Sequence, residues 1–599
     1  MGAIIGRMSF DPEEILARTV LDRMLEASVR RAIDARGVFA ARGIALGSCG
    51  APHADAAPLI GINDGQTIRA VADSHLTNAG ELRAALEGEG HRFHARTDEE
   101  LIAHAYDRWG THAFERLRGP FACAIWDEAD RRLVLARDHV GIRPLHFALL
   151  HGHGLVFASE IPALLQDPGV AREWCPDGID TYLALGYVPA PLTAYRRISK
   201  LEPAHFLVVE GRRLRLEEYW DLPVPSRATT AWRDVPTAVK GALKAAVRRD
   251  LNESGHAALL YSGGIASCTL LSVADGKVGL PITVDVDQDP SELARSDAAA
   301  AHLGRVRELE TVARPIPSLV EELTTASGEP LADPAAVMQF AVCKAAASRT
   351  DVALTAHGAA VFWAPSSRRR RLLSYLALHP QSNASLVNDA YRLWDGERRR
   401  SIYTRGFAWQ VREANPFVRH LERYASRVTG NQVDRALYVD ARTLLPDNTL
   451  AVAGRAAAAA GLSLRHPFLD RPMVELAMEI PAALKQRGRI DMYTLRRLLM
   501  PQLPPRLLPP ALRQPVRHAW LAPALTMLVP KMLLGPRFDG RGIVSRPALR
   551  QLWNEHLSSR VDHSRRLWAL LMLEFWFRDF IDGDAAAEPL EYAVLVKAA

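Results

Sequence analysis

The sequence predicts an α/β protein with two parts, an N-terminal α+β sandwich and a C-terminal doubly wound parallel sheet with a helical extension. Residues 1–225 alternate short apolar runs with Gly, Pro and Asp, a pattern typical of a sheet-rich domain. Beyond residue 225, strand-like runs alternate with helical patterns, which favours a parallel sheet. From Leu378 onward the pattern is almost wholly helical. We therefore expect two domains, residues 1–225 and 226–599.

In the first part, the strands are predicted from RRLVLARD, HFALL, GLVFAS and HFLVVEG. Apolar residues recur at three- and four-residue spacing over Ala79–Glu87 and Glu99–Trp109, which predicts two helices. The segment Asp221–Ala228 holds two prolines and shows no periodicity. It therefore marks the expected domain boundary.

The second part opens with a predicted helix over Val235–Leu251, followed by the apolar strand AALLY, the turn SGG and a further helix. The strands PITVDVD and VALTA follow, the latter just before Gly358. Strands that alternate with helices in this order predict a doubly wound sheet. Five consecutive alanines, 456–460, predict a helix interior where neighbouring helices approach closely.

Composition excludes several classes of protein. The 599 residues are 48% hydrophobic and 24% charged, as in soluble globular chains. The net charge of +6 is small and gives no argument for nucleic acid as a partner. Five separated cysteines without a CxxC pair indicate neither disulfides nor a Cys-type zinc site, and favour the cytoplasm. No signal peptide or run of about twenty apolar residues occurs, so we expect no membrane span.

One motif carries recognisable chemistry. Ser262-Gly263-Gly264-Ile265-Ala266-Ser267 follows a strand and begins a helix. Backbone N–H groups in such a turn can face a phosphate without obstruction by Cβ atoms, aided by the helix dipole. A tight βα turn that needs small residues is the alternative explanation for an isolated SGG. In its context the string resembles the SGGxDS loop of ATP-pyrophosphatases.

The surrounding strings extend this resemblance to the asparagine synthetase superfamily, over nearly the whole chain. Those of the first half are RTDEELIAHAYDRWG, RLRGPFACAIWDEADRRLVLARDHVGIRPLHFA, LVFASEIPALL, GYVPAP and EYWDL. Those of the second are LLYSGGIASC, SGEPLADPAAV, ALTAHGAA, HPFLDRPMVELAMEIPAALK and RLWALLMLEFWFRDF.

The resemblance implies an Ntn-type glutaminase sandwich that feeds ammonia to a synthetase. There ATP adenylates a carboxylate, pyrophosphate leaves, and an amine attacks the acyl-adenylate. The cofactors implied are ATP and Mg²⁺. The implied ATP-binding residues are Tyr261, Ser262, Gly263, Gly264, Ser267, Val284, Thr355, Ala356 and Gly358.

The glutaminase half departs from the family pattern. The family nucleophile is a cysteine directly after the initiator methionine, and here that position is Gly2. The family's asparagine-glycine-glutamate string is replaced by Asp73-Ser74-His75-Leu76-Thr77-Asn78, and Asp98 alone matches the acidic residue that holds the glutamine amino group. We therefore interpret Gly2 and Asp98 as parts of a vestigial glutamine site that does not hydrolyse glutamine.

The synthetase half departs as well. Ala266 and Ala360 occupy the positions of the two family aspartates that bind Mg²⁺, and Met492 occupies that of the family lysine. His357 stands where the family has a glutamate that can act as a base. A natural pseudoenzyme and a deliberately disabled chain both fit these losses. As a third alternative, Asp285, Asp287 and Asp289 follow the PITV run and offer replacement oxygens, although a solvated loop is the preferred explanation.

Other residues admit two interpretations each. His357 is either a neutral base or a hydrogen-bonded loop histidine. Cys268 lies at a helix start, which can activate a thiol, but a small buried residue is the simpler explanation and we assign it no role. The clusters Arg368–Arg371 and Arg398–Arg400 are either solvated helix faces or a docking surface for an acidic peptide.

Superfamily members without the cysteine include β-lactam-forming synthetases and the cyclases that close the macrolactam ring of lasso peptides. Both use an amine already present in the substrate, so loss of glutaminase function fits them better than asparagine synthesis. We expect the lasso-type lineage first. The expected partners are a peptide or small-molecule carboxylate that carries its own amine, and a precursor-peptide or protease partner. A non-catalytic binding protein that recognises nucleotide or peptide is the competing hypothesis.

Overall fold

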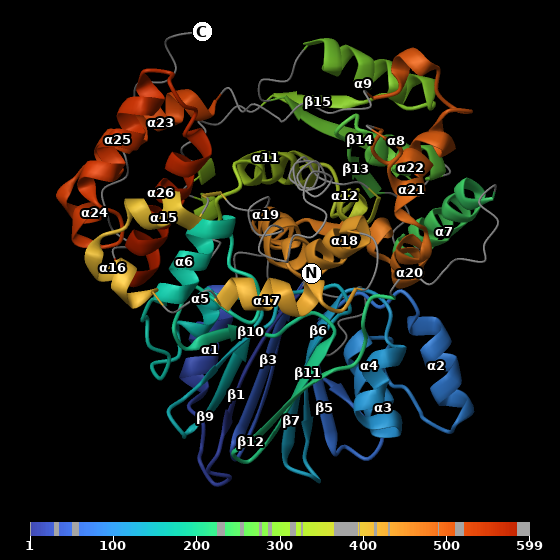
Figure 1. Ribbon diagram of the computed structural model, residues 1–599. Coiled ribbons are helices and arrows are strands. Elements are labelled where there is room, and N and C mark those ends of the chain that lie inside the picture. Colours follow the sequence, from blue (N-terminus) through green and yellow to red (C-terminus); the bar gives the residue numbers. More distant parts are fainter. Residues whose placement is uncertain are drawn as a thin grey trace.

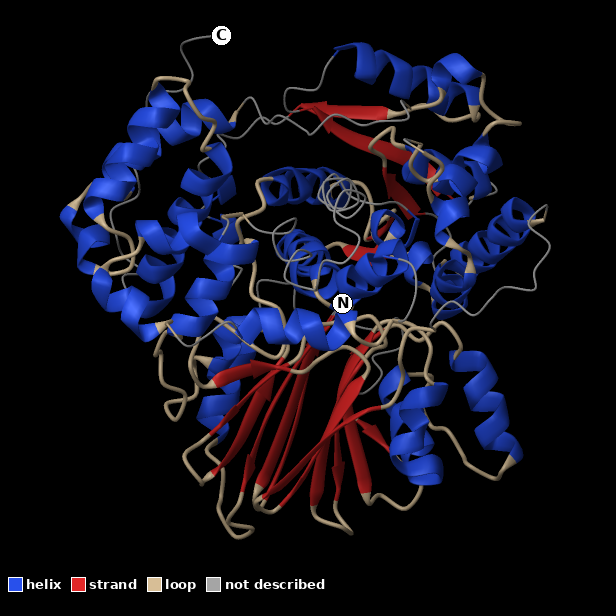
Figure 2. Cartoon of the chain, in the orientation of Figure 1, coloured by secondary structure: helices blue, strands red, loops and turns tan. Residues whose placement is uncertain are grey.

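The computed structural model describes residues 2–583 apart from the segments 29–34, 51–58, 224–233, 252–256, 275–277, 286–289, 312–318, 321, 325–327, 364–392, 395, 413–415, 429–431, 489 and 510–519. Two antiparallel sheets and one parallel sheet organise these residues (Figures 1 and 2). The predicted domain boundary at residue 225 lies outside the described residues.

The N-terminal part is a sandwich of two six-stranded antiparallel sheets. In spatial order, the first sheet holds β10 (Ile198–Lys200), β8 (His146–Leu149), β9 (Gly154–Ala158), β1 (Gly2–Ser9), β3 (Ile44–Gly50) and β2 (Ala35–Ala41). The second holds β12 (Arg213–Glu218), β11 (His205–Glu210), β7 (Arg132–Arg137), β6 (Phe121–Asp127), β5 (Ile68–Ser74) and β4 (Gly61–Ile62).

Helices cover both outer faces of the sandwich (Figure 1). They are α1 (Arg18–Ser28) and α5 (Ile161–Leu164) on the first sheet, and α2 (Ala79–Gly88), α3 (Asp98–Trp109) and α4 (Ala113–Arg116) on the second. The core between the sheets includes Ile4, Trp126 and Leu207. Because β6 is buried on both faces, all seven of its residues are buried and its sequence shows no polar alternation.

The parallel sheet has the strand order β15 (Glu308–Thr311), β14 (Val278–Asp285), β13 (Ala257–Leu260), β16 (Val352–Leu354) and β17 (Ser463–Arg465). Numbered along the chain this order is 3-2-1-4-5, so the direction of winding reverses between β13 and β16. Such a switch point leaves a crevice at the carboxyl ends of the two strands. The predicted doubly wound sheet is thereby confirmed, although β15 and β17 were not predicted.

The remaining helices surround the parallel sheet and extend beyond it. They are α6 (Pro176–Leu185), α7 (Val235–Asp250), α8 (Ile265–Val273), α9 (Pro290–His302), α11 (Ala335–Ala347), α12 (Ala359–Trp363), α15 (Gly396–Ile402), α16 (Arg405–Gln410), α17 (Pro416–Ala425), α18 (Gln432–Arg442), α19 (Ala451–Ala460), α20 (Arg471–Glu479), α21 (Ala482–Lys485), α22 (Tyr493–Leu499), α23 (Leu521–Met532), α24 (Pro536–Gly540), α25 (Arg546–Leu557) and α26 (Ser564–Trp576). The alanine run lies inside α19, which packs against α11 as the small side chains predict.

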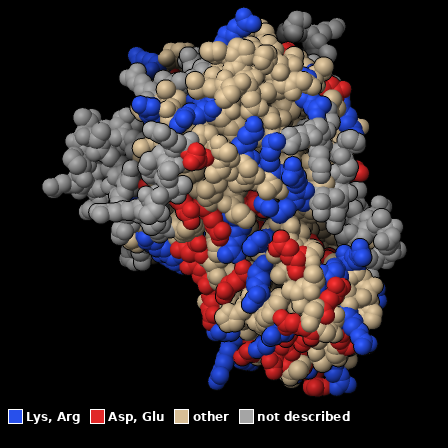
Figure 3. Space-filling view, turned by 90° about the vertical axis from the view of Figure 1, so that its right-hand side faces the viewer, with Lys and Arg blue, Asp and Glu red and all other residues tan. Residues whose placement is uncertain are grey.

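The surface carries charges of both signs. In the space-filling view, Lys and Arg residues are interspersed with Asp and Glu residues over the lower part of the face shown (Figure 3). Among the described residues, no helix is both long enough and apolar enough to cross a bilayer.

Candidate functional site

The predicted nucleotide residues gather at the switch point of the parallel sheet. The loop Tyr261–Gly264 leaves the carboxyl end of β13, and the loop Thr355–Gly358 leaves that of β16. The two strands are direct neighbours, with Leu259 opposite Leu354. The sheet therefore brings together two loops that lie about ninety residues apart in the sequence, where doubly wound folds bind their ligands.

The first loop depends on glycine at position 263. Gly263 has a φ of +65°, and a Cβ placed there would lie 2.3 Å from Ser296 Oγ on α9. Ser267 Oγ donates to the Gly264 carbonyl at 3.1 Å, which fixes the start of α8. Ser262 is exposed at the tip of the loop. The positive φ and the contact with Ser296 thus require glycine at position 263. The Gly264 N–H is directed at Ser262 Oγ, at 3.4 Å.

A cation lies against this loop that the sequence did not indicate. The Arg295 guanidinium on α9 donates to the Gly263 carbonyl at 3.2 Å. A second arginine, Arg496 on α22, is close enough for Arg295 to lower its pKa further after the larger effect of burial. The nucleotide loop therefore has positive charge beside it from Arg295 on α9.

The second loop is equally constrained. Gly358 has a φ of +88°, and a Cβ there would lie 2.1 Å from Leu469 Cδ2. His357 Nδ1 lies 2.6 Å from Thr355 Oγ1, and burial lowers the pKa of His357 to about 4. His357 is therefore neutral near pH 7 and hydrogen-bonded within its loop. This geometry supports the loop-histidine interpretation and leaves a weak base at most.

The three residues predicted to stand at charged family positions lie at the beginnings of helices. Ala266 and Ala360 are the second residues of α8 and α12, and Met492 precedes α22, which packs against both helices. Ala266 and Met492 are half-buried and Ala360 is exposed. Methyl and thioether groups offer no oxygen to a hard cation. These residues therefore do not fit Mg²⁺.

The residues predicted to form a vestigial glutamine site, Gly2 and Asp98, are engaged in internal hydrogen bonds. The Gly2 N–H donates to Asp73 Oδ1 at 3.1 Å. Asp98 Oδ2 accepts from Ser74 Oγ at 3.0 Å and from the Leu76 N–H at 2.9 Å. A Cβ at Gly2 would lie 2.9 Å from the Cys49 carbonyl oxygen. Asp98, the first residue of α3, thus holds the end of β5 and the residues that follow it.

Buried polar groups connect this region to the nucleotide loops. The Arg143 guanidinium lies 3.5 Å from Asp73. Burial, with Arg465 and Arg143, lowers the pKa of His75 to about 3. The same two arginines also lower the pKa of His466, after burial and His357. The rings of His466 and His357 have centroids 5.8 Å apart. Asp73, Arg143, His466 and His357 are therefore neighbours in a chain of buried polar side chains.

Two carboxyl groups, those of Asp250 and Asp470, lie next to these buried side chains. Burial, reinforced by the nearby Asp470 carboxylate, raises the pKa of Asp250 to about 7. Asp470 is paired with Arg249 at 2.5 Å. The Asp470 carboxylate is thus paired with a cation. The buried Asp250 carboxyl, with a pKa of about 7, is partly protonated near neutral pH.

The remaining predicted residues lie outside the two loops. Arg399 is buried and forms a two-point ion pair with Asp180, at 2.9 and 3.3 Å. The prediction that Arg398–Arg400 form a solvated or docking face is therefore wrong for Arg399. Cys268 is buried beside the Tyr261 hydroxyl, as a structural cysteine would be. The following lie outside the described residues: Arg368–Arg371, Asp287, Asp289 and the side chains of Val284 and Asp285.

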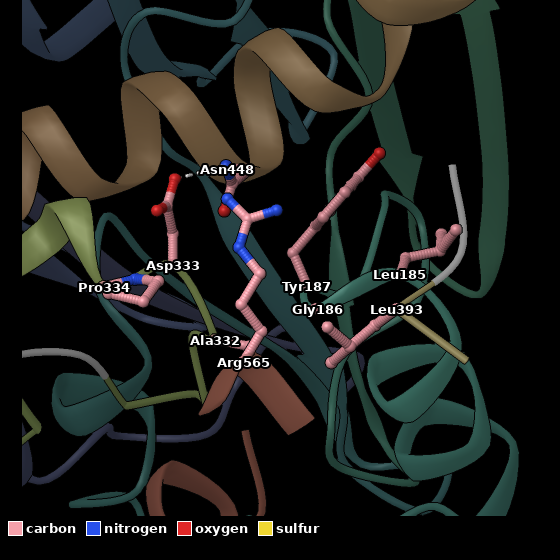
Figure 4. Close-up of a pocket in the computed structure, with 9 residues that line it drawn as sticks. All are labelled: Leu185, Gly186, Tyr187, Ala332, Asp333, Pro334, Leu393, Asn448 and Arg565. Atoms are coloured by element: carbon pink, nitrogen blue, oxygen red, sulfur yellow. Dashed lines mark hydrogen bonds between the residues drawn. The ribbon is translucent and has the colours of Figure 1, made fainter. Parts of the chain in front are cut away.

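A separate small pocket opens elsewhere in the C-terminal part (Figure 4). Its volume is about 50 Å³, and Asp333, Asn448 and Arg565 gather at one end of it. Asn448 Nδ2 donates to Asp333 Oδ2 at 3.4 Å. None of its lining residues belongs to either nucleotide loop. The volume holds a few water molecules and is far below that of a substrate site.

Comparison with known proteins agrees with this architecture. Residues 1–220 match the model of the glutamine amidotransferase domain, and residues 238–578 match that of asparagine synthase. The chain is 29% identical over 560 residues to the Mycobacterium tuberculosis protein named "Putative asparagine synthetase (glutamine-hydrolyzing)", covering 86% of this chain and 84% of that protein. It is 25% identical over 571 residues to asparagine synthetase (glutamine-hydrolyzing) 1 of Bacillus subtilis, covering 88% of each.

Among solved structures, the glutamine phosphoribosylpyrophosphate amidotransferase of B. subtilis aligns with 52% of this chain and 82% of that one, at 14% identity and a TM-score of 0.28. A score this low carries no argument about the fold.

Proposed function

Because this chain belongs to the asparagine synthase family, with a glutamine amidotransferase domain before the synthase region, we propose that it is an ATP-dependent amide-forming protein that takes its amine from the substrate. The observation that carries this proposal is Gly2, whose position lacks a nucleophile and whose N–H is bonded to Asp73. Within the family, the lasso peptide cyclase lineage, which makes macrolactams, fits best.

Hydrolysis of glutamine by such a domain needs a thiol and a free amine at one residue. Gly2 supplies no side chain, and the Cys49 carbonyl oxygen limits the space for one. The Asp98 carboxylate is engaged by Ser74 and Leu76. Ammonia from glutamine is therefore not an available nucleophile, and an amine carried by the substrate takes its place.

The synthetase reaction assigned to this lineage has two steps, each of which forms one bond and breaks another. A carboxylate oxygen attacks the α-phosphorus of ATP and pyrophosphate leaves; an amine then attacks the acyl carbon and AMP leaves, while a base takes the amine proton. The loop at Gly263, with Arg295 beside it, suits an anionic triphosphate. Neutral His357 can accept a proton, but a pKa of about 4 makes it a weak base.

A second candidate is a non-catalytic nucleotide-binding protein. It is favoured by Ala266, Ala360 and Met492, since none of these side chains binds a metal ion or stabilises an anion. Both candidates share ATP recognition and the absence of glutamine hydrolysis. They differ in whether a carboxylate is activated.

The experiment measures carboxylate-dependent ATP–pyrophosphate exchange in the native chain and in an Ala266→Asp/Ala360→Asp/Met492→Lys variant. The probes are aspartate and any short precursor peptide encoded beside the gene. The amide-forming proposal expects weak exchange with the peptide that rises at least tenfold in the variant. If both proteins stay at background with both probes, the non-catalytic candidate holds. Release of glutamate from glutamine by the native chain would overturn both.

A further inference from the structure

Three metal-ligating side chains meet on the outer side of the sandwich, away from the nucleotide loops. Asp64 belongs to the turn between β4 and β5, His91 to the loop between α2 and α3, and His104 to α3. One ligand atom from each lies within 4.8 Å of the other two. The residues come from three chain segments, so the fold and not local sequence brings them together (Figure 1 labels α2, α3 and β5).

The separation of the two imidazoles matches that of two ligands on one ion. His91 Nδ1 lies 3.0 Å from His104 Nδ1. Nitrogen ligands lie about 2.0–2.1 Å from Zn²⁺, which places two adjacent ligands about 2.9–3.4 Å apart for angles between 90° and 109°. The same distance suits a hydrogen bond between two neutral rings, so the separation alone does not decide.

Burial and orientation provide the second observation. His104 is fully buried and packs against Phe93, with ring centroids 4.5 Å apart and the ring planes tilted by 47°. Its Nε2 is buried without a hydrogen-bond partner among the described residues, so Nδ1 is the nitrogen aimed at the cluster. A buried imidazole therefore presents Nδ1 to His91 and Asp64.

The carboxylate is positioned as well. The Arg92 N–H donates to Asp64 Oδ2 at 3.1 Å, which ties the turn to the loop that carries His91. We propose that Asp64, His91 and His104 bind one divalent transition-metal ion, with Zn²⁺ as the expected ion and water completing its coordination. Imidazole nitrogens select Zn²⁺ and related ions over Mg²⁺ and Ca²⁺. The bound ion would join the β4–β5 turn, the α2–α3 loop and α3.

The test is titration of the tag-free full-length chain with Zn²⁺ by isothermal calorimetry. We expect a site with one Zn²⁺ per chain whose affinity falls at least tenfold in His91→Ala and in Asp64→Asn. Both side chains are at least partly exposed, so these variants keep the buried His104 in place. His94→Ala is the matched control, because His94 is exposed in the same loop and its backbone N–H donates to Glu100. This variant should bind as the native chain does.

Co²⁺ gives an independent readout, because its visible absorption reports the ligand geometry. A spectrum that changes on binding to the native chain and is lost in His91→Ala supports the site. Absence of Zn²⁺ binding, or binding that is unchanged in both His91→Ala and Asp64→Asn, would overturn the proposal and leave a hydrogen-bonded histidine pair only.

Discussion

The backbone N–H of Gly2 donates to Oδ1 of Asp73, at 3.1 Å, and thereby joins the first strand of one sheet to the end of β5 in the other. Asp73 is buried and also faces Arg143. The chain start is therefore part of a buried polar network. The proposed absence of glutamine hydrolysis rests on Gly2, so the contact bears directly on the proposed function.

Replacing Gly2 by cysteine should not create a glutaminase. The new Cβ would lie 2.9 Å from the Cys49 carbonyl oxygen, and Asp98 would still be bonded to Ser74 and Leu76. We expect no glutamate release above that of the native chain in a coupled glutamate assay. Measurable hydrolysis by Gly2→Cys would show that only the nucleophile had been lost.

Substitution of Gly263 by alanine should weaken ATP binding at least tenfold and destabilise the fold by about 1–3 kcal/mol, because positive φ strain adds to the contact with Ser296. Denaturant unfolding and calorimetry measure the two effects. Gly461→Ala is the matched control: its φ is +73° but no atom lies within 4 Å of the added Cβ. It should cost about 1 kcal/mol and leave ATP binding intact. Equal behaviour of the two variants would contradict the role of the Gly263 turn.

Loss of the ion pair between Arg399 and Asp180 should lower the free energy of unfolding far more than loss of an exposed arginine in the same run. Arg399→Ala leaves a buried carboxylate with only the Tyr403 hydroxyl of its present partners, and should cost about 3–5 kcal/mol in the free energy of unfolding. Arg400 is exposed on the same helix, so Arg400→Ala should change stability by less than about 0.5 kcal/mol. Similar losses in the two variants would rule out the ion pair as the cause.

Asp250 should make stability fall as pH rises. Its pKa is raised from 3.8 to about 7 in the folded chain, so the folded state holds a proton that the unfolded state releases. That contribution is full below the unfolded pKa and is lost as pH rises through about 7. Asp250→Asn mimics the protonated group. It should therefore gain on the order of 2 kcal/mol over the native chain between pH 5 and pH 8. A pH-independent difference between the two proteins would refute this.

Much of the fold was predictable because long periodic segments show their secondary structure in the sequence. The predicted helices at Ala79–Glu87 and Glu99–Trp109 differ from α2 and α3 by one residue at one end. The strands β15 and β17 were missed because ELET and SLR, unlike the equally short AALL of β13 and VAL of β16, form no apolar run, and their pairing depends on distant partners.

The site was predictable only where one segment contains the signal. The turn at Gly263 follows a strand and opens a helix, a pattern that is visible in the sequence. Arg295 was missed because its contact arises from the packing of α9 over that turn, 32 residues away. The arginine run was treated as uniform, yet a partner 219 residues away separates Arg399 from its neighbours. Residues that meet through the fold leave no local pattern.

We propose that this chain recognises ATP without the metal-binding carboxylates expected in its family, and ATP binding measured with and without Mg²⁺ decides whether it does. By calorimetry on the full chain, the dissociation constant for ATP should change less than about twofold when Mg²⁺ is replaced by a chelator. In Ala266→Asp/Ala360→Asp, Mg²⁺ should tighten binding at least tenfold, because two carboxylates then offer it oxygen ligands. No ATP binding by the native chain, or binding that requires Mg²⁺, would contradict the claim.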